Sequence, residues 1–312
     1  MRILVMGAGA LGGYFGARLI EAGRDVTFLV RPQRADKLRG GLVVKSPVGD
    51  IRLGDPPLAT AKTLKPPFDL VLLSCKAFDP ESAMDAMTLA VGPTTTILPL
   101  LNGMSHMDAL NARFGKGQVL GGWCAISATL NGQGEVLHLQ PFHSLSLGEQ
   151  DGGSSDRVVA MTRGLSGAKF EVLPVDSIMR EMWEKWLFIA AAAGATCLMR
   201  GPVGDILAAD PGLPAKLLDE CVSIAVKCGF PPSMPALDRF RTILTTPGSP
   251  FTASMLRDVE AGLRIEADHV IGDLLNRGER AGQAAPLLGV AYAHVKTYEA
   301  RRAREAQWSN GQ

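Results

Sequence analysis

The chain opens with the stretch MRILVMGAGALG (residues 1–12), in which a short apolar run leads directly into glycines spaced as GxGxxG. The run over residues 2–6 predicts a β-strand, residues 10–22 predict a helix, and residues 25–30 predict a second strand. A strand, a helix and a strand in succession indicate a right-handed βαβ unit in a parallel sheet. This opening stretch therefore predicts an α/β fold for the N-terminal part of the chain.

Further apolar runs extend this pattern through the first half of the sequence. Residues 69–74 and 95–101 are β-rich without clean polar alternation, which is typical of strands buried on both faces. Residues 42–45 and 50–53 flank Ser46-Pro47-Val48-Gly49 and predict a β-hairpin. The remaining predicted elements are strands over 118–129, 135–139 and 144–148 and a helix near 157–166.

The pattern changes after about Asp176. From there apolar residues recur at helical spacing almost to the end, and Pro/Gly groups separate the segments. We therefore predict an α/β domain over residues 1–175 and an all-helical domain over residues 176–312. A chain of 312 residues fits two domains, because a single core rarely grows past about 250–300 residues.

The glycine-rich turn predicts a dinucleotide site. Gly7 permits the tight turn, Gly9 lets a pyrophosphate approach the backbone, and Gly12 permits close packing of helix on strand. The helix start adds free N–H groups and the positive end of its dipole. The motif follows a strand and opens a helix, which predicts a Rossmann-type doubly wound sheet. The predicted cofactor-binding segment is Gly7, Ala8, Gly9, Ala10, Leu11 and Gly12.

The end of the second strand indicates which dinucleotide is bound. An NAD site has an acidic residue there for the ribose hydroxyls, whereas this chain has Arg31, with Arg34 nearby. An arginine can grip a 2′-phosphate with paired N–H donors, so we predict NADP(H). The alternative is that Arg31 and Arg34 are solvated loop cations.

Two polar residues follow predicted parallel strands. Lys76 comes after the 69–74 run and Asn102 after the 95–101 run. The carboxyl ends of parallel strands face the ligand crevice in open α/β sheets, so both residues are site candidates. Either one alone would more often be an ordinary loop residue.

The composition narrows the function classes. Lys and Arg number 32 against 31 Asp and Glu, whereas nucleic-acid binding needs a basic surplus or stripe. No stretch approaches the ~20 apolar residues of a membrane span, and the first apolar run is too short for a signal peptide. The five cysteines form no CxxC pair and the five histidines have no ligand-like spacing. We expect reduced thiols, no metal and a cytoplasmic protein.

Several segments resemble the ketopantoate reductase (2-dehydropantoate 2-reductase) family. The most specific is Ser254-Met255-Leu256-Arg257-Asp258-Val259-Glu260-Ala261-Gly262, continuing to Glu266-Ala267-Asp268. The others are Glu181-Met182-Trp183-Glu184-Lys185-Trp186, Cys75-Lys76-Ala77 and Asn102-Gly103-Met104. With the glycine-rich turn, the resemblance covers most of residues 1–300. It implies an NADP-dependent oxidoreductase of pantothenate biosynthesis that reduces a 2-oxo acid to the 2-hydroxy acid in a cleft between two domains.

The resemblance also implies a role for each matched residue. Lys185 matches the family's catalytic lysine, which bonds the keto oxygen and delivers the proton, and Glu266 matches the glutamate that orients it and contacts the reacting end. Ser254 matches a serine that helps to hold the substrate. Asn102 and Lys76 match residues near the nicotinamide and substrate, and Arg31 matches an arginine on the adenosine 2′-phosphate.

The spacing of apolar residues tests two of these roles independently. Lys185 falls at the border between an apolar helix arc and the opposite arc of Arg180, Glu181 and Glu184. The alternative to a catalytic role is an exposed ion pair with Glu181, which would contribute only ~0.3–0.5 kcal/mol to stability. Glu266 is expected on the apolar arc of one helix that carries Leu256, Val259, Leu263, Val270 and Leu274. A carboxylate there is costly unless it is paired, and Lys185 is the natural partner, with a helix cap or a buried water as the alternatives.

Four positions depart from the family's residue pattern and leave the identity of the substrate undetermined. Where the family places asparagines, this chain has Ile189, Ala193, Val203 and Phe251. A buried polar substrate group without a partner costs roughly 1–3 kcal/mol, so we expect weak binding of ketopantoate. Ser254, with Arg200 or Arg264, could still anchor a carboxylate.

Three functions are therefore consistent with the sequence. The first is a reductase of ketopantoate or a related keto acid, and the second is a paralogue acting on a bulkier or more apolar keto substrate. The third is a non-catalytic NADP(H)-binding sensor. The expected partner is a small-molecule 2-oxo acid, and the helical domain could also pair with a second copy as a homodimer.

Overall fold

The computed structural model describes residues 1–76 and 80–310, so Ala77 of the Cys75-Lys76-Ala77 match lies outside the described residues. The chain forms two compact units. The first comprises Met1–Leu101 and His106–Met179, and the second comprises Asn102–Ser105 and Arg180–Gln312. The boundary near residue 175 remains a prediction about where independently folding domains meet.

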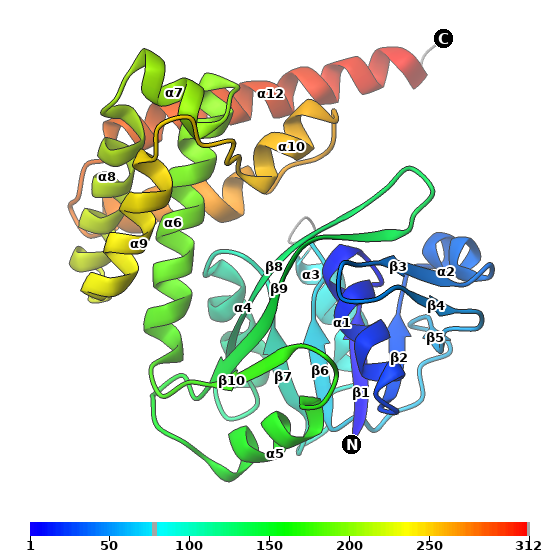
Figure 1. Ribbon diagram of the computed structural model, residues 1–312. Coiled ribbons are helices and arrows are strands. Elements are labelled where there is room, and N and C mark those ends of the chain that lie inside the picture. The colour runs from blue at the N-terminus through cyan, green and yellow to red at the C-terminus, as the bar shows by residue number, and fades with distance from the viewer. Residues whose placement is uncertain (77–79, 311–312) are drawn as a thin grey trace. The chain divides into compact units, whose positions relative to one another are not determined.

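The first unit is built on a five-stranded parallel sheet (Figure 1). Its strands, in spatial order, are β5 (Leu58–Ala59), β2 (Asp25–Leu29), β1 (Arg2–Met6), β6 (Leu70–Leu73) and β7 (Thr96–Pro99). All residues of β6 and β7 are buried, as expected of central strands covered on both faces. The four strands predicted for this sheet are confirmed, whereas the two-residue β5 is too short to show a periodic pattern.

A second sheet lies in the same unit. It contains, in order, β10 (Glu171–Pro174), β9 (Val136–Gly148), β3 (Leu42–Lys45) and β4 (Ile51–Leu53), with β8 (Gly121–Leu130) paired to β9. The predicted hairpin of β3 and β4 is confirmed. The runs predicted over 135–139 and 144–148 are confirmed as strand, but the break predicted between them is wrong, because β9 runs continuously through Pro141. This proline lies where the pairing with β8 is irregular, so its missing N–H removes no ladder hydrogen bond.

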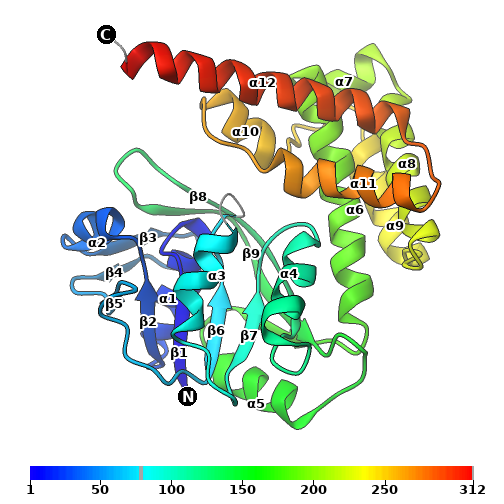
Figure 2. The same cartoon turned by 180° about the vertical axis from the view of Figure 1, so that it is seen from behind.

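Helices cover both faces of the first sheet, which confirms the doubly wound fold. Helix α1 (Ala10–Glu21) lies between the two sheets and contacts β2 on one side and β3, β8 and β9 on the other. Helices α3 (Pro80–Thr88) and α4 (Ser105–Phe114) lie on the opposite face (Figure 2). Helix α2 (Pro32–Leu38) follows β2, and α5 (Asp156–Leu165) precedes β10.

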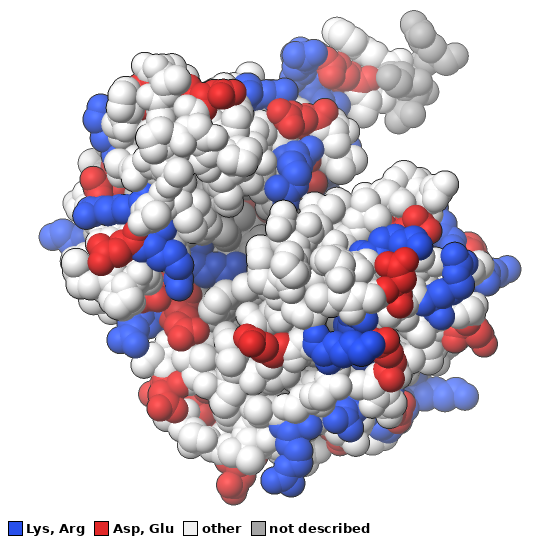
Figure 3. Space-filling view, viewed as in Figure 1, with Lys and Arg blue, Asp and Glu red and all other residues white. Residues whose placement is uncertain are grey.

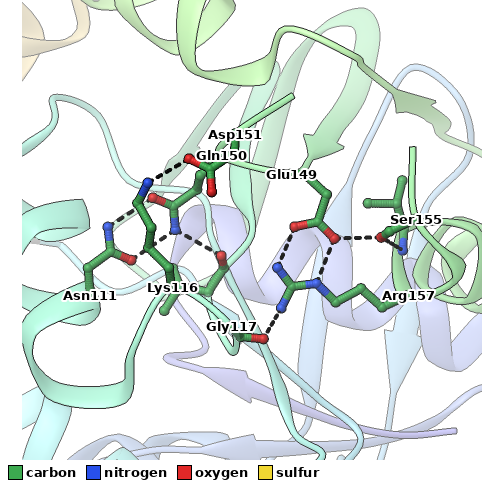
Figure 4. A network of polar contacts seen from close by, with 10 residues as sticks. Asn111, Lys116, Gly117, Glu149, Gln150, Asp151, Ser155 and Arg157 are labelled. Carbon is green, nitrogen blue, oxygen red and sulfur yellow. Dashed lines mark hydrogen bonds and ion pairs between the residues drawn. The ribbon is translucent and has the colours of Figure 1, made fainter. Parts of the chain in front are cut away.

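A polar network fixes the end of β9 to its neighbours (Figure 4). Glu149 forms an ion pair with Arg157 at 2.5 Å and accepts a hydrogen bond from Ser155 Oγ, also at 2.5 Å. The bond from Arg157 is the main reason why the pKa of Glu149 lies below its ordinary value. Gln150 and Asn111 exchange two hydrogen bonds of 2.8 Å. The network therefore joins β9 to α5 and α4 with a carboxylate that stays charged at neutral pH.

Charges of both signs are interspersed on the face shown in Figure 3. Ion pairs at the surface of the first unit include Lys45 with Asp50 at 2.8 Å and Lys116 with Asp151 at 2.6 Å. Exposed pairs of this kind contribute only about 0.2–1 kcal/mol each, so they add little to the stability of this unit. On this face no large area carries a single sign of charge.

The regular elements described in the second unit are all helices, which confirms the prediction of an all-helical part. Its elements are α6 (Ile178–Met199), α7 (Val203–Ala209), α8 (Leu213–Lys227), α9 (Met234–Thr245), α10 (Ser254–Glu260), the π-helix η1 (Asp268–Gly272), α11 (Asp273–Arg280) and α12 (Pro286–Asn310). Among the described helices, none alone is long and apolar enough to cross a membrane. The bent pair of α6 and α7 passes that test only together, across a 65° bend.

The single helix expected through residues 256–274 is wrong. Helix α10 ends at Glu260, and Gly262 adopts a φ of +67°, a left-handed conformation that glycine enters without steric cost. Leu263 is consequently 50% exposed instead of belonging to an apolar arc. Glu266 ends the irregular segment 263–266, and Ala267 separates it from η1, so its place in the fold differs from the one predicted.

Candidate functional site: a glycine-rich turn and a tethered Lys185–Glu266 pair of segments

The three glycines of the GxGxxG turn have different surroundings. Gly7 has a φ of +90° and lies against Cys75. A Cβ on Gly12 would come within 2.0 Å of the Gly7 carbonyl oxygen and 2.3 Å of Ser74 Oγ. A Cβ on Gly9 would meet nothing within 4 Å. The first and third glycines are therefore required by the fold, whereas the second faces open space.

The start of α1 leaves this open space suited to an anion. Gly9 is the N-cap residue, and no side chain caps the helix. The first turn contains no acidic residue, so no carboxylate of the helix opposes a bound phosphate. Backbone N–H groups at a helix start are donors without intrahelical partners, and the helix dipole favours negative charge there. The turn thus fits the pyrophosphate of a dinucleotide.

This turn lies where the order of the first sheet reverses. Strand β1 lies between β2, which follows it in sequence, and β6, which comes later. Ser74, just after β6, donates a hydrogen bond of 2.8 Å to the Met6 carbonyl and so joins the ends of the two strands. Ligands of open α/β sheets bind at such a switch point. Lys76 is exposed two residues beyond Ser74, close to the same strand end.

The two arginines after β2 differ in their surroundings. Arg31 is exposed and is the N-cap residue of α2. Arg34 is half-buried, and its Nη2 and Nε donate to the carbonyl oxygen of Ala8 at 2.7 and 3.1 Å. Burial lowers the pKa of Arg34, although a guanidinium stays charged in proteins. The alternative that both are solvated loop cations is therefore wrong for Arg34, which is bound to the glycine-rich turn itself.

In the second unit, one hydrogen bond joins the segments that carry Lys185 and Glu266. Trp186, fully buried beside Lys185 on α6, donates from Nε1 to the Val270 carbonyl at 2.8 Å. The Val270 N–H in turn donates to the Glu266 carbonyl at 2.9 Å. Lys185 itself is half-buried, as is Glu266. The tertiary structure thus tethers two residues that lie 81 positions apart in the sequence.

Glu184 corrects the expected division of this helix into two arcs. It was expected opposite the apolar arc, yet its exposed fraction is only 8%. Its Oε1 accepts a hydrogen bond of 2.7 Å from the Ser233 N–H before α9. A partner from another helix has made burial of this carboxylate tolerable.

The predicted substrate residue Ser254 lies at the first position of α10 and is exposed. The preceding residue, Ala253, donates its N–H to Thr196 Oγ1 of α6 at 3.4 Å, which ties this helix start to α6. Of the four apolar replacements, Ala193 and Val203 are buried. The other two, Ile189 and Phe251, are half-buried.

The loop after β7 belongs to the second unit, together with the segment that carries Glu266. Asn102 is half-buried in this loop. His269, three residues after Glu266, contacts this loop, since its Nδ1 and the Ser105 Oγ are 2.6 Å apart. Sequence reasoning gave this histidine no role, since a search for metal spacing cannot detect a ring that binds a distant loop. Among the described residues, no three His, Cys, Asp or Glu side chains are grouped as metal ligands.

The site residues predicted from sequence therefore fall into two sets. Gly7–Gly12, Arg31 and Lys76 lie in the first unit, and Lys185, Ser254, Glu266 and Asn102 lie in the second. Their chemical roles remain predictions. A doubly wound sheet with this turn, followed by a helical unit, defines the class of Rossmann-type two-part proteins.

Comparisons with known proteins agree with this architecture. Residues 3–152 match the family model described as Ketopantoate reductase PanE/ApbA, and residues 177–299 match Ketopantoate reductase PanE/ApbA C terminal. The chain belongs to the ketopantoate reductase family, and it is an oxidoreductase.

Individual relatives are similar over nearly the whole chain. An uncharacterized oxidoreductase, YkpB, of Bacillus subtilis (strain 168) is 39% identical over 307 residues, covering 97% of this chain and 100% of the relative. A solved 2-dehydropantoate 2-reductase of Geobacter metallireducens GS-15 is 28% identical, with a TM-score of 0.85 and coverage of 95% and 99%. A D-mandelate dehydrogenase solved with NADH and anilino(oxo)acetate shares the fold at 19% identity, with a TM-score of 0.85 and coverage of 97% and 100%.

Proposed function

We propose that this protein reduces a 2-oxo acid to the corresponding 2-hydroxy acid with NADPH. The family supports reduction of keto acids with a nicotinamide cofactor. The observation that carries the proposal is the buried bond from Trp186 to Val270, because it tethers the segment of Lys185 to that of Glu266. A proton donor and a carboxylate that orients it are what carbonyl reduction requires.

The chain's own residues would divide the work as follows. The uncapped start of α1 and the space beside Gly9 would hold the pyrophosphate, with Lys76 and Asn102 nearer the nicotinamide. When bound, the cofactor supplies hydride to the keto carbon. Lys185 would bond the keto oxygen and give it a proton, Glu266 would orient the ammonium group, and Ser254 would help to hold the carboxylate.

The experiment that tests this function is a panel of 2-oxo acids mixed with the protein and NADPH, followed by NADPH absorbance. The proposal expects oxidation of NADPH with at least one acid and formation of the 2-hydroxy acid. Tight NADPH binding without oxidation by any acid in the panel would contradict it and would favour a cofactor-binding sensor.

The substrate prediction follows from the apolar replacements. Ile189 and Phe251 are half-buried where the family has polar groups, so a hydroxyl of ketopantoate would lose hydrogen-bond partners at a cost of roughly 1–3 kcal/mol each. We expect a 2-oxo acid with an apolar tail to have a higher kcat/KM than ketopantoate. The competing substrate is ketopantoate itself, which would place the reaction in pantothenate biosynthesis. Ketopantoate ranking first in kcat/KM across the panel would contradict the prediction.

The cofactor prediction concerns the 2′-phosphate. Arg31 is exposed at the start of α2, and its neighbour Arg34 already binds the Ala8 carbonyl. We expect NADPH to bind more tightly than NADH, and Arg31→Ala to reduce this preference by roughly 1–3 kcal/mol, the size of a charge-assisted hydrogen bond. Calorimetry of both cofactors checks this. Arg39→Ala is the matched control, since Arg39 is exposed just after α2 and pairs with Asp36. Equal affinity of the unmodified protein for NADPH and NADH would show the prediction to be wrong.

A further inference from the structure

His269 contacts the loop after β7 at several points. Its Nδ1 lies 2.6 Å from Ser105 Oγ, and it is hydrogen-bonded to the backbone of Asn102. Gly103, between these two residues, has a φ of +77°, and a Cβ there would come within 2.6 Å of the His269 carbonyl oxygen and 3.0 Å of its ring. One residue of the helical unit thus holds Asn102, Gly103 and Ser105 together.

The protonation state of the ring fits both bonds. Burial is the main cause that lowers the pKa of His269, and the charge of Arg277 acts in the same direction. Three other interactions raise this pKa: the charges of Glu266 and Asp273 and the bond to the Asn102 backbone. The bond to the backbone has the effect expected when a ring N–H donates to a carbonyl oxygen. A neutral ring can donate through one nitrogen to the Asn102 backbone and accept the Ser105 hydroxyl proton at Nδ1.

The position of His269 in its own segment links this loop to the proposed catalytic residues. Glu266 lies three residues before it, and Val270, directly after it, accepts the bond from Trp186. The segment 266–270 is therefore joined on one side to the helix of Lys185 and on the other to the loop of Asn102. It also enters the π-helix η1, a form of helix that often occurs at functional sites.

We propose that His269 is a positioning residue: it holds the Asn102–Ser105 loop in the conformation that places Asn102 at the nicotinamide end of the cofactor. The inference rests on the proposed function for its kinetic consequence, but the contact between ring and loop does not depend on it. Misplacing a group in an active site by about 1 Å can cost on the order of 100-fold in rate, so the contact between this ring and the loop is a sensitive point.

The test uses the full chain and four variants. His269→Phe keeps a ring but loses both hydrogen bonds, Ser105→Ala loses one, and the double variant combines them. His294→Phe is the matched control, since His294 lies half-buried on α12 of the same unit. Hydrogen exchange of the 102–105 backbone reports the loop itself, and kcat with KM reports its consequence.

We expect His269→Phe to speed exchange over 102–105 by at least about 10-fold, Ser105→Ala by about 3-fold, and His294→Phe not at all. With the 2-oxo acid reduced fastest by the unmodified protein, His269→Phe should lower kcat by about 10- to 100-fold and leave the KM for NADPH within about twofold. The double variant should be no slower than His269→Phe, because the two residues act as a unit.

Unchanged exchange in His269→Phe would overturn the inference whatever the kinetics. Faster exchange with unchanged kcat would also overturn it, since the loop would then be held without any catalytic consequence. If the unmodified protein reduces no 2-oxo acid, the proposed function fails, and hydrogen exchange alone decides the inference. Protection of 102–105 that increases on adding NADPH, and only when His269 is present, supports the inference. Lack of this His269-dependent protection overturns the inference.

Discussion

Replacing Lys185 with alanine is expected to lower kcat for the preferred 2-oxo acid by at least about 100-fold, while the Kd of NADPH stays within about twofold. Addition of hydride leaves negative charge on the keto oxygen, and a proton donor within about 3 Å must neutralise it as it develops. Lys185 is half-buried and is followed by the fully buried Trp186, so its backbone is firmly placed. Steady-state turnover and calorimetry of NADPH measure the two quantities.

Two further lysine variants sharpen this test. Lys185→Arg keeps the positive charge but offers a group that does not give up its proton, so it should be nearly as slow as the alanine variant. Lys227→Ala is the matched control, because Lys227 is exposed in the last turn of α8, and it should keep turnover within about twofold. Near-normal turnover of Lys185→Ala would remove its catalytic role and leave only a surface pair with Glu181, contributing a few tenths of a kcal/mol.

The effect of replacing Glu266 on kcat should depend on Lys185. Glu266→Gln keeps the size of the side chain and removes the charge, and it should also lower kcat. The variant that combines Glu266→Gln with Lys185→Ala should lose less than the sum of the two, because residues that act together are not additive. Strict additivity of the two effects in free energy would indicate that the residues act separately.

The second large effect is expected at Gly12. A Cβ there would lie 2.0 Å from the Gly7 carbonyl oxygen, so Gly12→Ala must displace the turn that binds the cofactor. We expect the free energy of unfolding to fall by about 1–3 kcal/mol, the usual cost of overpacking. The Kd of NADPH should rise at least about 10-fold, corresponding to about 1.4 kcal/mol of binding free energy. Thermal unfolding and calorimetry check the two effects separately.

Two other glycines of the same segment separate folding from binding. A Cβ on Gly9 would meet nothing within 4 Å, so Gly9→Ala should cost no more stability than a changed N-cap residue, about 1 kcal/mol or less. The added methyl group should nevertheless hinder binding of the pyrophosphate. A Cβ on Gly16 would come within 2.3 Å of the buried Phe28 ring, away from the turn. Gly16→Ala should therefore lose stability and keep NADPH affinity in the folded protein. Unchanged NADPH affinity in both Gly9→Ala and Gly12→Ala would rule out a cofactor site at this turn.

Short-range information in the sequence was sufficient for much of the fold. The apolar runs at 2–6, 69–74 and 95–101 become the buried strands β1, β6 and β7, and the GxGxxG turn occupies the switch point. Hydrophobic periodicity and glycine spacing are local properties of a chain, so they can be recognised without knowledge of distant partners. The family resemblance likewise rests on short segments, and the comparisons confirm it.

Two features differ from the prediction. Apolar spacing predicted one helix through residues 256–274, but Gly262 is a local stop signal that ends α10 before Glu266. Glu184 is buried because the Ser233 backbone supplies a partner from another helix.

The residues of the candidate site show the same division. Sequence alone determined the α/β and helical parts of this protein, the glycine-rich turn and which residue types stand at its candidate site. Only the tertiary structure decided that Arg34 binds Ala8, that Trp186 tethers Lys185 to the Glu266 segment and that His269 holds the Asn102 loop. Each of the last two is a contact between residues more than 80 positions apart, and such contacts form only when packing brings distant segments together.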